Sequence, residues 1–275
     1  MKRKWSLICA ASLCGAIALC VAPPAMAGAR DETGKQPLVV GGNVADPGQW
    51  PFMAAIFYDG NQGCGGTVIA PTAILTAAHC VDGFPARDMS VVTGRRALSD
   101  VGSGEAIDVL GYYVHPYYGH DGRTDLAVIR LERPTSAPAA QLSEPWFDRA
   151  ITARGSVLRV AGWGATTPYG EDGGSDVLLE TSERVKRNRA CRRAYRGSYA
   201  KYDQVCTTGS KINFGQNTSS CFGDSGGPIV ADTSNGRRVV GVVSFGGRRC
   251  GHPRFPSVYA RVAPQLDWLA AAATA

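Results

Sequence analysis

The sequence predicts an all-β protein, either a sandwich or a barrel. Short β-rich runs bounded by turn residues recur along the chain, few segments have helical periodicity, and strands do not alternate with helices as βαβ units require. The 275 residues are enough for one or two domains with a sizeable core. A composition rich in glycine and only 19% charged is typical of a globular chain and argues against a disordered one.

Residues 1–27 predict a secretory signal peptide. A basic start, MKRKW, is followed by the apolar run SLICAASLCGAIALCVA and by Ala25-Met26-Ala27, a small-x-small cleavage site. A membrane anchor is the alternative, but the apolar run is a little short to cross a bilayer and the cleavage site favours removal. Because no later run is long and apolar enough, we expect no membrane association after removal. Residues 28–38 are polar and predict a short pro-segment.

The chain has 9 cysteines, and three of them leave with the signal peptide. An even number in an exported chain predicts three disulfides, for which 15 pairings are possible. No C-x-x-C motif and no cluster of histidine and cysteine indicates zinc or redox chemistry, so we expect no cofactor. The cysteines that remain are Cys64, Cys80, Cys191, Cys206, Cys221 and Cys250.

The first half of the mature chain contains several strand-like runs. They are FMAAIFY (52–58), GTVIA (66–70), AILTA (73–77) and AIDVLGYYV (106–114). A further apolar run, LAVIRL, follows an acid at position 125 and is typical of a buried strand. The stretch 134–145, PTSAPAAQLSEP, is poor in regular patterns and predicts a connection between two halves.

The second half of the mature chain also contains short strand-like runs. Its strand-like runs are SVLRVAGWG (156–164), DVLLETSERV (176–185), GGPIVAD (226–232), RRVVGVVSFG (237–246) and SVYARV (257–262). Between them, KRNRACRRAY (186–195) predicts a short helix. Residues 263–273 predict a C-terminal helix, because Pro264 lies near the start and Leu266 and Leu269 form a narrow apolar stripe.

Three separated motifs carry side chains suited to catalysis. CFGDSGGPIV sets Ser225 among small residues, TAAHC puts His79 beside a cysteine, and TDLAVIRL puts Asp125 at the head of an apolar run. A single such residue is usually structural, so the argument depends on all three occurring together. The other histidines are interpreted as structural: His115, His120 and His252.

In this order, His then Asp then Ser, the motifs resemble those of the chymotrypsin- and trypsin-like serine proteases. The resemblance runs from VVGG, which begins at Val39, to the C-terminal helix. It implies a protease domain over 39–275, with two six-stranded antiparallel barrels at about 39–140 and 150–262 followed by the helix. It also selects the disulfides Cys64–Cys80, Cys191–Cys206 and Cys221–Cys250.

The resemblance further implies a catalytic triad that hydrolyses peptide bonds through an acyl-enzyme. His79, as an imidazole that titrates near neutral pH, would take the proton of the Ser225 hydroxyl. Asp125 would orient the His79 ring and stabilise its charged form. The N–H groups of Gly223 and Ser225 would form the oxyanion hole.

Asp224 has a different role in this family, where it pairs with the α-amino group that activation cleavage creates. Here that amine would belong to Val39, so we expect a zymogen that is cut between Leu38 and Val39. Leu38 is not the Arg or Lys after which trypsin cuts. It suits the pocket described next, so we expect the enzyme to activate itself.

The family's pocket floor lies six positions before the nucleophile. Here it is Ser219, in place of the Asp that attracts Arg or Lys. Gly246 leaves the entrance open, and Ser257, where glycine is usual, makes the pocket shallower. The sequence therefore predicts cleavage after large apolar residues: Phe, Tyr, Leu or Met. The predicted substrate-binding residues are Ser219, Ser220, Ser244, Phe245, Gly246 and Ser257, of which 244–246 would pair with the substrate backbone.

Three other polar features of the sequence do not indicate a further binding or modification site. Arg248 and Arg249 near the rim either favour acidic groups or are simply solvated. Arg95 stands where calcium-binding relatives carry a carboxylate in the loop 94–105, so we expect no structural calcium. Asn217 begins a glycosylation sequon, but it lies in the pocket loop and we expect it unmodified.

The charge of the chain bears on its partners. The formal charge of +6 falls to +3 once the five basic and two acidic residues before Val39 are removed. This net charge gives only a weak electrostatic field, and the sequence has no basic stripe interleaved with aromatic residues. Both observations argue against binding of nucleic acid. We expect a monomer that acts on protein or peptide substrates and that protein protease inhibitors can bind.

The sequence suggests two other functions. A catalytically silent homologue that acts as a binding protein usually lacks a triad residue, whereas this chain keeps all three together with Gly223. The second is an esterase with a different fold, because residues 223–227 match the G-x-S-x-G motif of the nucleophile elbow in such enzymes. The order His, Asp, Ser excludes it, because those esterases carry Ser, acid, His.

Overall fold

In the computed structural model, the residues described are 39–118, 124–212 and 215–275. The predicted signal peptide and pro-segment, 1–38, lie outside the described residues, and so does His120.

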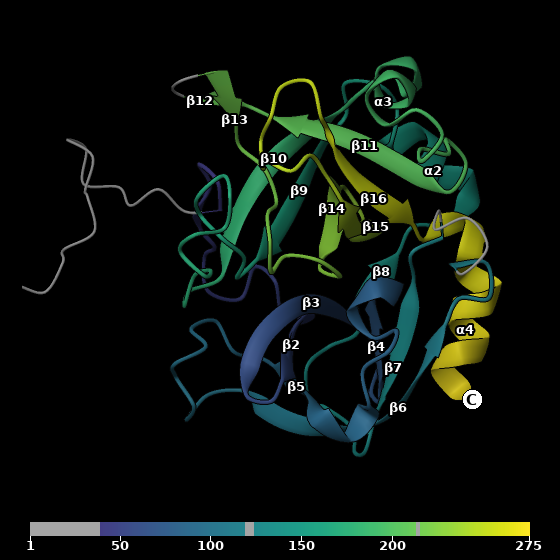
Figure 1. Ribbon diagram of the computed structural model, residues 1–275. Helices are drawn as coiled ribbons and strands as arrows, with labels where there is room; N and C mark the ends of the chain where they lie inside the picture. The colour runs from purple at the N-terminus through teal and green to yellow at the C-terminus, as the bar shows by residue number, and fades with distance from the viewer. Residues whose placement is uncertain (1–38, 119–123, 213–214) are drawn as a thin grey trace, which may run out of the picture. The chain divides into compact units, whose positions relative to one another are not determined.

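The first half of the described chain forms a closed antiparallel barrel, coloured purple to blue-green in Figure 1. Its strands follow one another around the barrel in the order β2-β3-β4-β7-β6-β5. Their bounds are β2 Met53–Tyr58, β3 Asn61–Ala70, β4 Ala73–Thr76, β5 Met89–Thr93, β6 Glu105–Val114 and β7 Ala127–Leu131. All four residues of β4 are buried, because this strand faces both the barrel core and the rest of the molecule.

The second half forms another six-stranded antiparallel barrel, in the order β9-β10-β11-β16-β15-β14, which closes where β14 pairs with β9. The strands are β9 Val157–Gly162, β10 Leu179–Val185, β11 Gln204–Gly209, β14 Pro228–Thr233, β15 Gly236–Phe245 and β16 Ser257–Arg261. The predicted all-β fold with two barrels is confirmed. Closure on both sides decides for barrels over a sandwich, which periodicity alone could not do.

Short strands extend the second barrel. β1, Asn43–Val44, pairs with β10, and β8, Gln141–Leu142, pairs in parallel with β15. A small separate sheet is made by β12, Lys211–Ile212, and β13, Gln216–Asn217.

Helical segments lie at the edges of the barrels. The predicted helices are present as α3, Asn188–Tyr195, and α4, Leu266–Thr274. The short 3-10 turns are η1 Ala78–Cys80, η2 Ala86–Asp88 and η4 Ala263–Gln265. A further helix, α2, Pro145–Ile151, begins at the end of the stretch predicted as an irregular connection. Proline suits the first turn of a helix, where its missing N–H costs nothing, so Pro145 is a start signal there.

A buried ion pair fastens α2 to the second barrel. Asp148 is only 2% exposed and accepts a hydrogen bond from the Arg261 guanidinium in β16. The same guanidinium donates to the Thr152 hydroxyl at 2.9 Å. A buried charge pair of this kind contributes little net stability, but losing either partner would leave the other charge uncompensated.

All three predicted disulfides are present. They join Cys64 to Cys80, Cys191 to Cys206, and Cys221 to Cys250. Each joins segments 15 to 29 residues apart, so each constrains a loop next to the barrels.

The C-terminal helix α4 leaves the second barrel and packs on the first, against β4 and β7 (Figure 1). Leu269, 1% exposed, belongs to the same apolar cluster as Ile74 and Ile129 of the first barrel. Arg130 in β7 donates to the Ala273 carbonyl at 2.9 Å. The helix therefore ties the end of the chain to the barrel that comes first in sequence.

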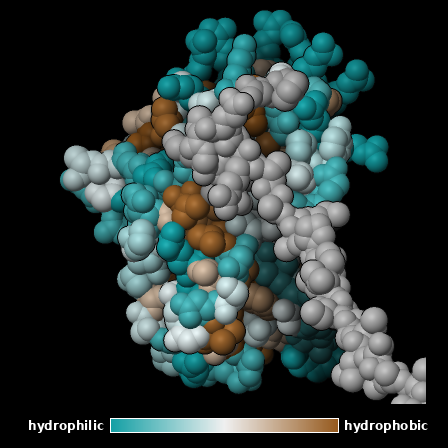
Figure 2. Space-filling model, turned by 90° about the vertical axis from the view of Figure 1, so that its left-hand side faces the viewer, coloured by the Kyte–Doolittle hydropathy of each residue, from teal (hydrophilic) through white to brown (hydrophobic). Residues whose placement is uncertain are grey.

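The surface is mostly polar on the side shown in Figure 2, where hydrophobic residues form separate patches among hydrophilic ones. None of the helices in the described part of the chain has the length and apolar character needed to cross a bilayer.

Replacing Leu269 by alanine should destabilise the folded chain by about 2–5 kcal/mol, because it leaves a cavity between α4 and the first barrel. Denaturant unfolding of the two proteins measures the loss. The matched control is Ala270→Ser on the exposed side of the same helix, for which a change within about 0.5 kcal/mol is expected. Equal stability of the Leu269 variant and the parent would contradict this packing.

Candidate active site

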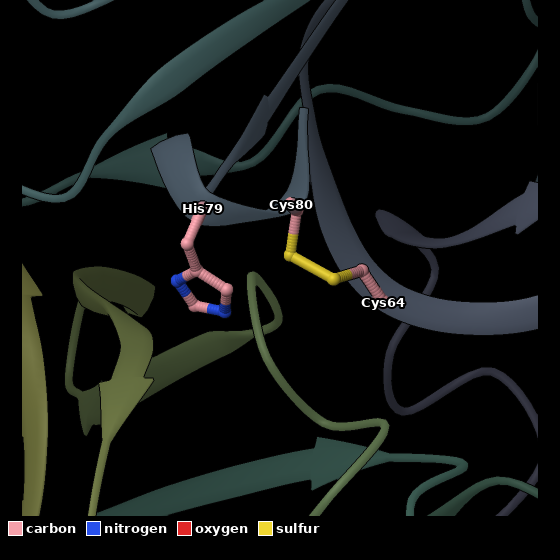
Figure 3. A group of neighbouring side chains, drawn as sticks. All are labelled: Cys64, His79 and Cys80. Carbon is pink, nitrogen blue, oxygen red and sulfur yellow. A yellow bond between two sulfur atoms is a disulfide. The ribbon is translucent and has the colours of Figure 1, made fainter. Parts of the chain in front are cut away.

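His79 lies in η1, the turn that follows β4. The disulfide from Cys80 to Cys64 anchors this turn to β3, and in Figure 3 the imidazole projects away from the disulfide towards the green and olive ribbon of the second barrel. Ligand atoms of these three residues lie within 4.8 Å of one another. Both sulfurs are joined in the disulfide, so neither is a thiolate that could bind a metal.

Asp125 holds His79 in place from the segment just before β7. Its Oδ2 lies 2.7 Å from His79 Nδ1, and its Oδ1 accepts the His79 backbone N–H at 3.0 Å. The hydroxyl of Ser244 donates to the same Oδ2 at 2.6 Å. Burial by itself raises the pKa of Asp125, but the hydrogen bonds from His79 and Ser244 outweigh burial and hold the pKa below its ordinary value. The carboxylate is therefore ionised and fixes the orientation of the ring.

Ser225 comes from the second barrel, in the loop between β13 and β14, but it is held against the first. Gly65 in β3 donates its N–H to the Ser225 carbonyl at 2.7 Å. The next residue, Gly226, has φ 81°, and a Cβ there would lie 2.2 Å from the Thr76 hydroxyl. Only glycine fits so close, and the contact brings Ser225 to the end of β4, which leads into His79.

No hydrogen bond between the Ser225 hydroxyl and the His79 ring is formed in the part of the chain that the structure describes. Hydrogen bonds of this kind often tighten only when substrate is bound.

The backbone around Gly223 exposes free donors. Within the described residues, no backbone hydrogen bond occupies the N–H of Gly223 or that of Ser225. Gly223 has φ 92°, a conformation that favours glycine. Its carbonyl accepts a hydrogen bond from the Gln62 side chain at 2.9 Å, which fixes the orientation of this part of the loop.

Asp224 points away from Ser225 into the protein and is 1% exposed. It accepts the N–H groups of Gly164 and Cys221, both at 2.8 Å. Gly162 and Gly164 pass so close that a Cβ on either would clash with the Asp224 carboxyl group. No described basic side chain pairs with Asp224, and burial raises its pKa to about 7.

Val39, the residue expected at the mature N-terminus, is buried and has φ 41°. This left-handed conformation is unfavourable for a β-branched residue. Val40 is buried as well, and its carbonyl accepts the Ser219 N–H at 3.2 Å, so this segment contacts the loop that carries Asp224.

A cavity of about 300 Å³ opens beside Ser225. All six residues predicted to bind substrate line it: Ser219, Ser220, Ser244, Phe245, Gly246 and Ser257. At its floor the hydroxyls of Ser219 and Ser257 are 3.0 Å apart. A Cβ added at Gly246 would meet nothing within 4 Å, so this position leaves the entrance open. Phe245 packs edge-on against Tyr195, with ring centroids 5.2 Å apart.

The two arginines near this cavity differ. Arg248 is exposed on the rim, whereas Arg249 donates to the Gln216 side chain at 3.3 Å.

Comparison with known proteins identifies this arrangement. A family model described as Trypsin matches residues 39–269. The chain belongs to the trypsin family. It is 34% identical over 233 residues to Trypsin of Saccharopolyspora erythraea, covering 84% of this chain and 96% of that protein. It is 33% identical over 251 residues to Transmembrane protease serine 5 of Homo sapiens, covering 86% of this chain but only 53% of that protein. The chain is accordingly a serine endopeptidase.

Two residues of this trypsin-family site were not anticipated. Gln62 reaches the Gly223 carbonyl across 161 positions of sequence, which no local pattern indicates. Glu183 lies behind the pocket floor and is 0% exposed. A signal for Glu183 was available, because Leu179, Thr181 and Val185 alternate along β10 on the buried face and Glu183 falls in the same register.

Arg95 occupies the loop that binds calcium in some trypsin-family members. Its guanidinium donates to the carbonyls of Ser103 at 2.9 Å and Leu98 at 3.3 Å. A cation already bonded to these carbonyls opposes a metal ion in the same loop.

The uncleaved trypsin-family chain should lose stability as pH rises from about 4 to about 7. With its pKa raised to about 7, folded Asp224 keeps a proton that the unfolded chain releases near pH 4, so the effect levels off above pH 7. The difference in pKa corresponds to roughly 4 kcal/mol. Denaturant unfolding of the Ser225→Ala precursor at several pH values measures it.

Asp224→Asn in the same precursor should remove this part of the pH dependence. Glu183 contributes in the same direction, so the comparison is between the slopes of the two proteins, not their absolute stabilities. Identical slopes would show that Asp224 is already ionised before cleavage.

Proposed function

We propose that this chain is a secreted serine endopeptidase, made as a zymogen, that cleaves peptide bonds after large apolar residues. The observation that carries the proposal is the His79–Asp125 pair of the first barrel, bonded at 2.7 Å, facing a serine loop from the second barrel beside an open cavity. Two barrels thus supply the two halves of one catalytic group.

His79 acts as the base in the first step of this mechanism. With Nδ1 engaged by Asp125, Nε2 is the nitrogen left to take the proton of the Ser225 hydroxyl as its oxygen attacks the substrate carbonyl. The ionised Asp125 stabilises the imidazolium that forms. His79 then gives the proton to the leaving amine, and the same sequence with water as nucleophile releases the acyl group from Ser225.

Gly223 and Ser225 stabilise the charge that develops on the carbonyl oxygen. Their N–H groups have no backbone partner among the described residues, so they are available as donors. One such donor is worth about 3–4 kcal/mol in the transition state. Gln62 keeps the Gly223 peptide oriented through its bond to the carbonyl.

Residues 244–246, at the end of β15, pair with the substrate backbone as an added strand. Ser244 then has two functions, because its side chain also donates to Asp125 at 2.6 Å. This double role links the substrate-binding edge to the triad.

The specificity follows from the neutral pocket. Ser219 and Ser257 bond to each other across the floor, and Ser257 shortens the cavity. The described residues that line the cavity include no Asp or Glu. Phe245 and Phe255 add apolar wall, and Gly246 leaves room at the entrance. Large apolar side chains fit such a slot at neutral pH, whereas arginine has no counter-charge on its surface.

Activation rests on the new amino group of Val39. In the uncleaved chain Val39 is held at φ 41°, a torsion defined by the bond to Leu38, so cleavage of that bond relieves the strain. The freed amine then has a buried partner in Asp224, which otherwise lacks a basic partner among the described residues. Leu38 suits the apolar pocket, which makes the enzyme a candidate for its own activator.

Secretion rests on the signal peptide at 1–27, and the pro-segment 28–38 leaves at activation. We propose a monomer as the active form, with protein protease inhibitors among its partners.

Cleavage of a peptide library at pH 7 by the mature enzyme should occur after Phe, Tyr, Leu and Met. Ser219→Asp should lower kcat/KM for these substrates by about tenfold or more, because it buries an unpaired carboxylate at the floor. Ser219→Ala, which adds no charge, is the control and should keep the apolar preference. Preferential cleavage after arginine by the unmutated enzyme would refute the assignment.

Ser225→Ala should abolish peptide hydrolysis, with a loss of about 10⁶ in turnover, while the protein stays folded. The same variant, purified as the secreted precursor, should keep residues 28–38 until a trace of active enzyme removes them. N-terminal sequencing shows whether residues 28–38 are retained. Reaction with a fluorophosphonate, which labels only a working serine, shows whether the nucleophile has been lost.

Three outcomes would change this picture. Near-normal proteolysis by Ser225→Ala removes Ser225 as the nucleophile. A Ser225→Ala precursor that matures alone to a Val39 N-terminus contradicts self-activation. Active enzyme that retains 28–38 contradicts the pairing of Val39 with Asp224.

A further inference from the structure

A buried carboxyl group lies directly behind the floor of the pocket. Glu183 belongs to β10, which contributes no residue to the cavity wall. Its carboxylate accepts the Ser220 N–H at 3.2 Å and the Thr207 hydroxyl, and the hydroxyls of Ser257 and Tyr259 also interact with it. Ser220 and Ser257 line the cavity themselves, so only the floor residues separate Glu183 from a bound side chain.

The carboxyl group of Glu183 has no counter-ion in the described part of the chain, where no Lys, Arg or His forms an ion pair with it. An ionised carboxylate is costly in such a site, and burial accordingly raises the pKa of Glu183, although its hydrogen bonds act in the opposite direction. A cation brought into the cavity would favour the ionised form.

The floor is suited to receive such a cation. The hydroxyls of Ser219 and Ser257 are 3.0 Å apart, and those of Ser220 and Tyr259 are 3.1 Å apart. A hydroxyl both donates and accepts, so this group can turn oxygen lone pairs towards an ammonium group and hydrogens towards the Glu183 carboxylate. A lysine side chain has the right form, because its methylene stem suits the apolar walls and its ammonium group is compact.

We propose that Glu183 is a specificity determinant of this pocket, whose ionised form admits a lysine side chain that the neutral floor alone would exclude. The inference rests on the proposed function and deepens it. Apolar side chains are accepted whatever the state of Glu183, whereas lysine is accepted only when Glu183 is charged. The acid that attracts a cation is thus set behind the pocket surface, on a strand that the cavity does not touch.

Other titratable groups around Glu183 are few. Tyr259 in β16 faces it, but burial raises the pKa of this phenol well above its ordinary value, so it does not titrate near neutral pH. Asp224, in the loop before β14, also interacts with Glu183. Asp224 does not line the pocket, so any effect of its charge that is specific to lysine acts through Glu183 and is lost in Glu183→Gln. From β9, the residue opposite Glu183 is the apolar Leu158. From β11 it is Gly209, and Thr207 of the same strand reaches the Glu183 carboxylate through its hydroxyl.

The test compares two peptides that differ only in the residue before the cleaved bond, lysine in one and norleucine in the other. Norleucine is lysine without the ammonium group, so the ratio of the two kcat/KM values isolates the charge. Because Glu183 ionises as pH rises, we expect this ratio to rise at least tenfold along a series from acid to alkaline pH in the mature enzyme and to stay flat in Glu183→Gln. Any effect of pH that is common to both peptides cancels in the ratio.

Glu180→Gln is the matched control. It lies on the same strand, pairs with Arg159 and does not line the cavity, so the rise should persist. Glu183→Met, of similar volume, replaces Glu183→Gln if the latter does not fold, and should also give a flat ratio.

The outcomes separate the two proposals. If both peptides are cleaved but the ratio is flat in the parent enzyme, or rises equally in the Glu183 variants, Glu183 is a purely structural residue and the inference is wrong. If neither peptide is cleaved and a fluorophosphonate does not label Ser225, the proposed function fails and this inference falls with it.

Discussion

The contact between the Ser225–Gly226 turn and the first barrel is the constraint on which the site depends. Two backbones meet there without an intervening side chain, and the hydrogen bond from Gly65 fixes their register. Ser225, the nucleophile in our proposal, is therefore carried by one barrel and positioned by the other. Because protein interiors repack poorly around an inserted methyl group, even a small side chain at Gly226 would separate Ser225 from His79.

The electrostatics of the second barrel complement this geometry. Two buried carboxyl groups bond to the loop that bears the pocket: Glu183 accepts the Ser220 N–H, and Asp224 accepts the Cys221 N–H. Each is costly to ionise without a cation, and burial raises the pKa of both. In our proposals the missing cations come from outside the folded barrel, one from the newly cut chain end and one from the substrate.

Most of the fold was predictable, because the deciding signals are local. The motifs around His79, Asp125 and Ser225 are contiguous. Alternation marks the long strand β6, and a continuous apolar run marks β15. Strands β5 and β11 were missed because they bury polar residues such as Thr93, Gln204 and Thr207, so neither sequence is a continuous apolar run or a clear alternation. Helix α2 was missed because its only strong start signal, Pro145, closes a stretch rich in turn residues.

The site was less fully predictable for a different reason. Family resemblance predicted that the six pocket residues would line one cavity. It could not predict the interactions of their hydroxyls, which depend on how the strands pack in three dimensions. Glu183 shows the limit clearly. Its inward direction follows from the register of β10, whereas its position behind Ser220 and Ser257 depends on the closure of the barrel.

The path of the C-terminal helix has a consequence for how long the enzyme survives its own activity. The chain builds the first barrel, then the second, and returns through α4 to the first, so the two barrels cannot part unless Leu269 and the Arg130 anchor are released. Separation of the two barrels therefore requires global unfolding and does not occur as a local fluctuation. An endopeptidase digests whatever chain is open, including its own, and degradation follows the population of open forms. A short helix at the very end of the sequence thus limits how fast the enzyme consumes itself.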